Sequence, residues 1–202
     1  MAKFEVCCHK WADLSEATYG VSILNDSKYG FSTSGNLMRL SLLRSPKAPN
    51  ANADMGRHFI RWGIFPHRGP LGWQTVKKGF EFNTPVRIAS HPDPAKLLTL
   101  MSPFRLQGGK GLVLDTLKRA EDDEDVSRGD FPVRNGKSVV CRVYDALGGK
   151  NRAVLEAGYA KVGKAWKCNI LEDDLEELPI KDGGVEIELQ SFEVASYRLL
   201  LE

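Results

Sequence analysis

The chain has 202 residues, of which 42% are hydrophobic and 27% charged, a composition typical of a globular protein that buries a core of its own. The net charge of +2 gives no overall attraction to nucleic acid, so we expect no nucleic-acid partner. No run of about 18 apolar residues occurs, and we therefore expect no membrane partner.

Charge is uneven along the chain. Residues 1–110 hold 15 Lys or Arg and 7 Asp or Glu, a net +8, whereas residues 111–202 hold 13 and 19, a net −6. The ordinary explanation is two halves that attract within one fold, or a solvated face; the alternative is a basic surface that meets a separate acidic domain. We place a sub-boundary near residues 120–136.

The four cysteines lack C-x-x-C spacing, which favours reduced, apolar side chains.

Short runs rich in β-branched and aromatic residues alternate with Gly, Pro, Asn and Asp. This pattern predicts an all-β fold with many strands and little helix. The expected strands are 4–11, 19–24, 29–32, 37–43, 57–66, 97–106, 111–119, 138–146, 152–159, 165–171, 185–189 and 192–201. Together they are enough for a large multi-stranded β-sandwich over residues 1–202.

Three segments depart from the simple strand pattern. Apolar residues follow one another almost without a break in 57–66, which predicts burial on both faces of that strand. Residues 74–82 fit neither the strand nor the helix period, so we expect mixed structure there. Residues 121–125 are all acidic. We expect them to form an exposed, mobile loop whose deletion leaves folding nearly unchanged.

One stretch carries long motifs. Residues 24–30 read LNDSKYG, residues 35–46 read GNLMRLSLLRSP, and residues 53–59 read ADMGRHF. This stretch resembles the C-terminal β-rich region of the class II α-mannosidases, glycoside hydrolase family 38, of the cytosolic and vacuolar type. The match is strongest over 9–67, poor over 68–136, and returns weakly in VCRVYDA at 140–146. Ser27 and Ser191 stand where the family usually has Cys and Pro.

The resemblance implies a supersandwich-like C-terminal domain without catalytic residues of its own. In this family an aspartate nucleophile and a zinc (or cobalt) ion sit in a separate α/β domain, and nothing here matches that domain. The expected partners of this chain are the catalytic domain, a mannose-containing oligosaccharide and further copies in a homo-oligomer. The expected compartment is the cytoplasm, or the vacuole by delivery from the cytosol. The alternative is a stand-alone carbohydrate-binding or scaffolding β-domain.

We expect no metal site within the chain. His91 and Asp93 repeat an H-x-D spacing of the family's zinc ligands, but they lie in a Pro-rich loop outside the matching stretch. A catalytic zinc needs about three protein ligands, and four scattered histidines supply no obvious set.

Candidate site residues come from the loops of the first 67 residues. Asp26, Lys28 and Tyr29 occupy a turn: in one reading Asp26 caps its own backbone, and in the other the three face the sugar cleft. Asp54, with Arg57 or His58 beside it, either ties down its own loop or makes a contact across the domain seam.

Two arginines are candidates for an interface. Arg39 and Arg44 flank a leucine-rich strand. Arg39 alternates with the apolar positions and is therefore expected to point outward. An outward Arg beside apolar residues suits an interdomain or subunit interface, where Arg is enriched.

Overall fold

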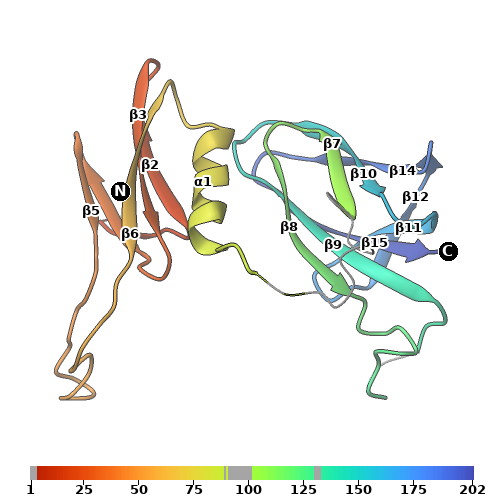
Figure 1. Ribbon diagram of the computed structural model, residues 1–202, viewed down its shortest axis with the longest axis horizontal. Helices are drawn as coiled ribbons and strands as arrows, with labels where there is room; N and C mark the ends of the chain where they lie inside the picture. The colour runs from red at the N-terminus through yellow and green to blue at the C-terminus, as the bar shows by residue number, and fades with distance from the viewer. Residues whose placement is uncertain (1–3, 89, 91–101, 130–132) are drawn as a thin grey trace. The chain divides into compact units, whose positions relative to one another are not determined.

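The computed structural model describes residues 4–88, 90, 102–129 and 133–202, and it divides the chain into two compact units, 1–90 and 91–202 (Figure 1). The described parts are mostly strands with a single helix, so the all-β prediction is confirmed. The sub-boundary expected at 120–136 falls inside the second unit. No helix among the described residues is long and apolar enough to cross a membrane.

The first unit has three layers. A central antiparallel sheet is built in the order β2 (Trp11–Ser15), β3 (Tyr19–Asn25), β6 (Trp62–Arg68). Helix α1 (Trp73–Asn83) packs on one face of this sheet. A second sheet packs toward the other face, in the order β1 (Val6–Cys7), β4 (Gly30–Ser34), β5 (Leu37–Leu40). A small core of Cys8, Ala12 and Phe31, extended by Ile23, Met38 and Leu40, joins the two sheets.

Helix α1 replaces the mixed structure expected for residues 74–82. Thr75, Val76 and Gly79 are buried on one side of the helix, at the spacing of a helical face. Gly79 allows the close approach, because a Cβ there would lie 2.6 Å from the ring of Trp11. The local sequence favours neither a strand nor a helix, so packing against the sheet decides in favour of the helix.

The second unit is a two-layer β-sandwich. One sheet has the order β13 (Ile180–Lys181), β14 (Gly184–Leu189), β10 (Asn151–Ala157), β7 (Phe104–Gly108). The other has the order β12 (Asp174–Leu178), β11 (Val162–Cys168), β15 (Val194–Leu201), β9 (Lys137–Asp145), β8 (Leu112–Arg119). Apolar side chains of both inner faces form one core. Part of the strand expected at 97–106, residues 97–101, lies outside the described residues.

Alternation along β14 is confirmed. Val185, Ile187 and Leu189 are buried in the core, while Glu186 is exposed and Glu188 half-buried on the opposite face. The period-two pattern of the sequence therefore assigned the correct face to each side chain.

The expectation of a free acidic loop is wrong. Asp123 has no exposed surface, and its Oδ2 accepts hydrogen bonds from the backbone N–H of Ser138 at 2.6 Å and from Arg119 at 2.9 Å. Asp122 pairs with Arg198 in β15. Composition alone predicts solvation of an acidic run, but these carboxylates serve as partners for backbone and guanidinium groups brought to them by the fold.

The expectation that residues 57–66 are buried on both faces is also wrong for this chain. Phe59 is 84% exposed, and within β6 Trp62 is 51% and Ile64 61% exposed. Helix α1 covers the opposite face of the sheet, and β6 is an edge strand whose outer positions Trp62 and Ile64 the second sheet leaves largely open.

Candidate functional site

A buried amide fixes the polar loop at residues 25–30. Asn25 ends β3 and has no exposed surface. Its Oδ1 accepts the backbone N–H of Lys28 at 3.1 Å, and its Nδ2 donates to Cys8 Sγ at 3.6 Å. Asn83 of α1 donates to the carbonyl of Asn25 at 2.9 Å. The capping role that the sequence suggested for Asp26 therefore belongs to Asn25, and the loop is held from three directions.

Asp26 pairs with an arginine that the sequence did not single out. Arg61 Nε donates to Asp26 Oδ2 at 3.1 Å, and its Nη2 donates to the carbonyl of Phe82 at 2.8 Å. The guanidinium also lies 4.7 Å from the centre of the Phe82 ring. Arg61 lies 35 residues after Asp26, so only the pairing of β3 with β6 brings the two together.

Lys28 and Tyr29 complete the loop. The ring of Tyr29 lies 4.6 Å from the ring of His9, and Tyr29 is 46% exposed. Lys28 is half-buried, and within the described residues its ammonium has no hydrogen-bond or ion-pair partner. A phenol and a free ammonium are therefore presented at the surface beside the Asp26–Arg61 pair.

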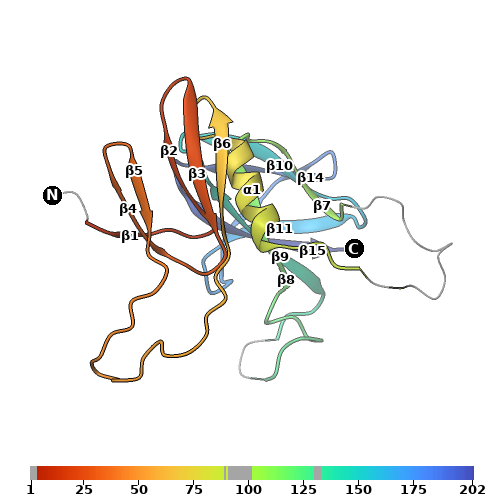
Figure 2. The same cartoon turned by 60° about the vertical axis from the view of Figure 1, so that its left-hand side comes forward.

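Residues 41–61, which we call the arm, connect β5 to β6 as a long loop running away from the strands (Figure 2). Asp54 Oδ2 accepts the backbone N–H of Ser45 at 3.1 Å, which ties the two sides of the arm together. His58 contacts the carbonyl of Asp54 at 2.8 Å, and Arg57 lies over the ring of Phe59 at 4.9 Å. The two basic side chains therefore contact the Asp54 backbone and the Phe59 ring and not the Asp54 carboxylate.

The structure thus separates the predicted residues into two groups. Asp26, Lys28 and Tyr29 share the polar loop, whereas the contacts of Asp54, Arg57 and His58 are with residues of the arm itself. Arg39 is exposed on β5, with its side chain on the outward positions as expected from alternation, and Arg44 is exposed at the start of the arm.

A buried polar cluster lies between the central sheet and α1. Asp13 Oδ2 accepts from Ser22 Oγ at 2.6 Å and contacts His67 Nε2 at 2.7 Å, and Ser22 also contacts Thr75 at 2.8 Å. In a catalytic triad the histidine takes the proton of the serine, but here both groups meet the same carboxylate oxygen. Ser22 has no exposed surface. This cluster therefore tethers the helix to the sheet.

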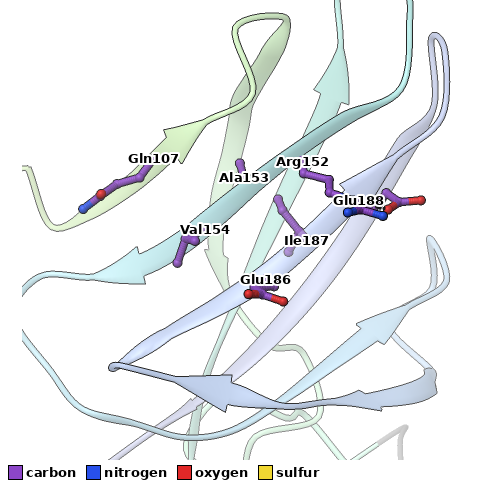
Figure 3. Close-up of a pocket in the computed structure, with 7 residues that line it drawn as sticks. All are labelled: Gln107, Arg152, Ala153, Val154, Glu186, Ile187 and Glu188. Atoms are coloured by element: carbon purple, nitrogen blue, oxygen red, sulfur yellow. Dashed lines mark hydrogen bonds and ion pairs between the residues drawn. The ribbon is translucent and has the colours of Figure 1, made fainter.

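Each unit also has one hollow of note. A groove of about 570 Å³ in the first unit is lined mainly by apolar residues of β2, β3, β5 and β6. A polar hollow of about 510 Å³ lies on the β10–β14 sheet of the second unit (Figure 3). Its side chains are paired: Arg152 Nε donates to Glu188 at 2.5 Å, and Gln107 donates to Glu156 at 2.7 Å.

The described residues do not form a zinc site. No group of three or more His, Cys, Asp or Glu side chains among them is arranged to hold a metal ion. His91 and Asp93 lie outside the residues that the structure describes.

Comparison with known proteins gives matches at both ends of the chain. Residues 1–52 match the glycosyl hydrolases family 38 C-terminal domain, and residues 132–197 match the glycosyl hydrolases family 38 C-terminal beta sandwich domain. The chain belongs to the C-terminal region of glycosyl hydrolase family 38.

Curated relatives agree with this assignment. An alpha-mannosidase of Saccharomyces cerevisiae is 44% identical and covers 98% of this chain, and human alpha-mannosidase 2C1 is 36% identical and covers all of it. Alpha-mannosidase G of Dictyostelium discoideum is 34% identical over 98% of the chain. The chain spans 18–19% of the length of these relatives.

A solved structure shows the same fold. A family 38 protein from Enterococcus faecalis superposes with a TM-score of 0.68 at 15% identity, over 96% of this chain and 22% of that protein. At this identity the likeness concerns the fold alone. The β-rich architecture described above is therefore that of a family 38 protein.

Proposed function

We propose that this chain is the C-terminal part of an α-mannosidase that hydrolyses terminal non-reducing α-D-mannose residues of free oligosaccharides. The nucleophile and a zinc or cobalt ion would belong to a catalytic α/β domain outside this chain. The part described here would shape the substrate cleft and support the catalytic domain and a homo-oligomer, with Arg39 and Arg44 at an interface. The family membership and the alpha-mannosidase names of the relatives support this proposal.

The observation that carries the cleft role is the rigid polar loop. Sugar hydroxyls are both donors and acceptors, so a site for them needs both kinds of group in fixed positions. The ammonium of Lys28 offers donors that no described residue uses. The phenol of Tyr29 is accessible, and Asn25 prevents the loop from collapsing. We propose that Lys28 and Tyr29 face the substrate, with Asp26 holding Arg61 beside them.

The arm residues Asp54, Arg57 and His58 are proposed to act differently. Their contacts are local, so their contribution to the cleft would be to hold the shape of the arm against the catalytic domain. For the whole enzyme we propose a cytoplasmic location, or a vacuolar one by delivery from the cytosol.

The first test compares the 202-residue chain with the full-length enzyme on an aryl α-mannoside, with zinc or cobalt supplied. We expect turnover by the full-length enzyme only. Metal-dependent turnover by the chain alone would place the catalytic carboxylates within it and overturn the proposal.

The second test addresses the loop. In the full-length enzyme we expect Lys28→Ala to lower kcat/KM about tenfold or more, the loss of a charged hydrogen bond, while the melting temperature stays within about 2 °C. Lys164→Ala, an exposed residue of β11 in the second unit, is the matched control and should change neither. If kcat/KM is unchanged in both Lys28→Ala and Asp26→Ala, the loop has only a structural role.

A second candidate function is a stand-alone carbohydrate-binding domain. The polar hollow in Figure 3 favours it, because Arg152, Glu186 and Glu188 line a concave surface with groups that can bind hydroxyls. Titration of the chain with mannose oligosaccharides tests it: binding that Arg152→Ala abolishes would support this function, and no binding at millimolar sugar would remove it.

A further inference from the structure

We infer that the outer face of β6, with the apolar groove beside it, is the docking surface for the catalytic part of the same polypeptide. This inference rests on the proposed function and adds to it the place of contact. The partner surface it requires has an apolar centre and an acidic rim.

The register of the central sheet defines the face. Trp62, Ile64 and Pro66 alternate along β6 and therefore point to the same side, away from α1. Ile23 on β3 lies opposite Ile64, and Val21 lies opposite Pro66. On this side the two strands present Val21, Ile23, Trp62, Ile64 and Pro66, between Asn25 at one end and Arg68 at the other. Trp62 and Ile64 are 51% and 61% exposed.

The groove continues this face. Its walls include Leu14, Val21, Ile23, Met38 and Ile64, and its volume is about 570 Å³. Ser15, Glu16 and Asn36 also line it. A mainly apolar exposed surface with a few polar residues is typical of a surface that is covered in the working protein.

A strand that faces water in the same chain looks different. On β14 the outward positions carry Glu186 and Glu188, and the inward positions carry apolar residues. On β6 the outward positions carry Trp62, Ile64 and Pro66 instead, with Arg68 at the end of the strand. The near-continuous apolar sequence of 59–65 is typical of a strand buried on both faces, and the structure covers only one of them.

Charge in the segment that leads into β6 selects the kind of partner. Residues 39–61 contain Arg39, Arg44, Lys47, Arg57 and Arg61, with a single carboxylate among them. Two copies of this face would bring like charges together, which disfavours a symmetric contact of the chain with itself. A partner with carboxylates around an apolar centre is the complementary surface.

Continuity with the polar loop identifies that partner. Trp62 lies opposite Asn25, and the preceding residue, Arg61, pairs with Asp26. The apolar face therefore begins where the polar loop begins. The relatives are about five times as long as this chain, so most of their length lies outside it. A segment of that length that reached the polar loop would also reach Trp62, which is next to it.

Thiol accessibility tests the inference without relying on activity. Ile64→Cys is made in the 202-residue chain and in the full-length enzyme, and alkylation at position 64 is followed by peptide mass spectrometry, which separates it from the exposed Cys7. We expect position 64 to react at least about tenfold more slowly in the full-length enzyme. Lys181→Cys on β13, whose native side chain is 61% exposed, is the control and should react equally in both.

Equal reactivity of position 64 in both proteins would overturn the inference. Alkylation at position 64 that is slow in the 202-residue chain and becomes faster on dilution would mean that a second copy of the chain covers the face. That result would overturn the inference as well. If position 64 is protected from alkylation in the full-length protein but that protein hydrolyses no mannoside, the docking surface stands and the proposed function is rejected. As an independent variant, Ile64→Asp should leave folding of the chain unchanged and reduce the yield of intact full-length enzyme after limited proteolysis.

Discussion

Arg198 and Asp122 form an ion pair across 76 residues of sequence, with Nη1 donating to Oδ1 at 2.6 Å. The side chain of Arg198 is 1% exposed, and its other contacts are Asp174 at 3.2 Å and the carbonyl of Glu172 at 2.8 Å. A buried guanidinium needs such partners, because an unpaired charge in the interior is strongly unfavourable. The acidic run therefore supplies a counter-charge to the second sheet of the sandwich.

Removal of that counter-charge should destabilise the second unit. We expect Asp122→Ala to lower the free energy of unfolding by about 3 kcal/mol. This is the lower end of the range for breaking a buried ion pair, because Arg198 keeps Asp174 as a partner. Urea unfolding measures the change. Glu186→Ala, which removes an exposed pair with Lys181, is the control and should leave the midpoint unchanged. Equal midpoints for the two variants would show that the Arg198 pair contributes nothing.

The acidic run itself should be required for folding of the second unit. Asp123→Ala leaves the backbone N–H of Ser138 buried without an acceptor, a loss of about 2 kcal/mol or more. Deletion of residues 121–125 should cost at least as much, contrary to the expectation from composition. The neighbouring Asp125→Ala removes a carboxylate whose side chain is 52% exposed and serves as the control. A deletion variant with unchanged cooperative unfolding would restore the free-loop interpretation.

Loss of the buried amide should loosen the polar loop. Asn25→Ala removes the acceptor of the Lys28 N–H and the donor to Cys8, and we expect a loss of about 1–3 kcal/mol in the free energy of unfolding. In the full-length enzyme the same change should lower kcat/KM. Ser27→Ala is the control, because among the described residues the side chain of Ser27 makes only an exposed hydrogen bond with Asp26. Identical effects of the two variants would count against the positioning role of Asn25.

Acid should weaken the second unit through Glu193. The backbone N–H of Gln190 and the ammonium of Lys167 lower the pKa of the Glu193 carboxyl below its ordinary value. A carboxyl with a lowered pKa in the folded state stabilises fully above its unfolded pKa, and this stabilisation is lost as pH falls through the folded pKa. We therefore expect stability to fall below about pH 4.5.

Glu193→Gln tests this assignment, because the amide keeps an acceptor oxygen but does not titrate. Urea midpoints measured from pH 7 to pH 3 should fall less steeply with acid in this variant than in the native chain. Parallel curves for the two proteins would assign the acid sensitivity to other carboxyls.

Much of the strand pattern was predictable from the sequence, because burial of alternate side chains leaves a local signature. Val185, Ile187 and Leu189 were assigned to the core from their spacing alone, and the structure buries all three. The turn at residues 25–30 was also predictable, since Asn and Asp favour turns through their own side chains. The long motifs around that turn were sufficient to indicate the family.

The residues that complete the site were not predictable in this way. No local pattern marks Arg61 as the partner of Asp26, because the pair depends on the register of β3 with β6. The helical state of residues 73–83 depends on the approach of Gly79 to Trp11, which is a contact between distant elements.

By itself, then, the sequence determined the β-rich fold class, the faces of the regular strands and membership in family 38. The tertiary structure alone decided which charges are buried and which apolar residues are exposed. The physical reason is that hydrophobic periodicity is recorded within a single strand, whereas the pairing of Asp122 with Arg198 and the open face of Ile64 depend on which strands and loops lie next to one another.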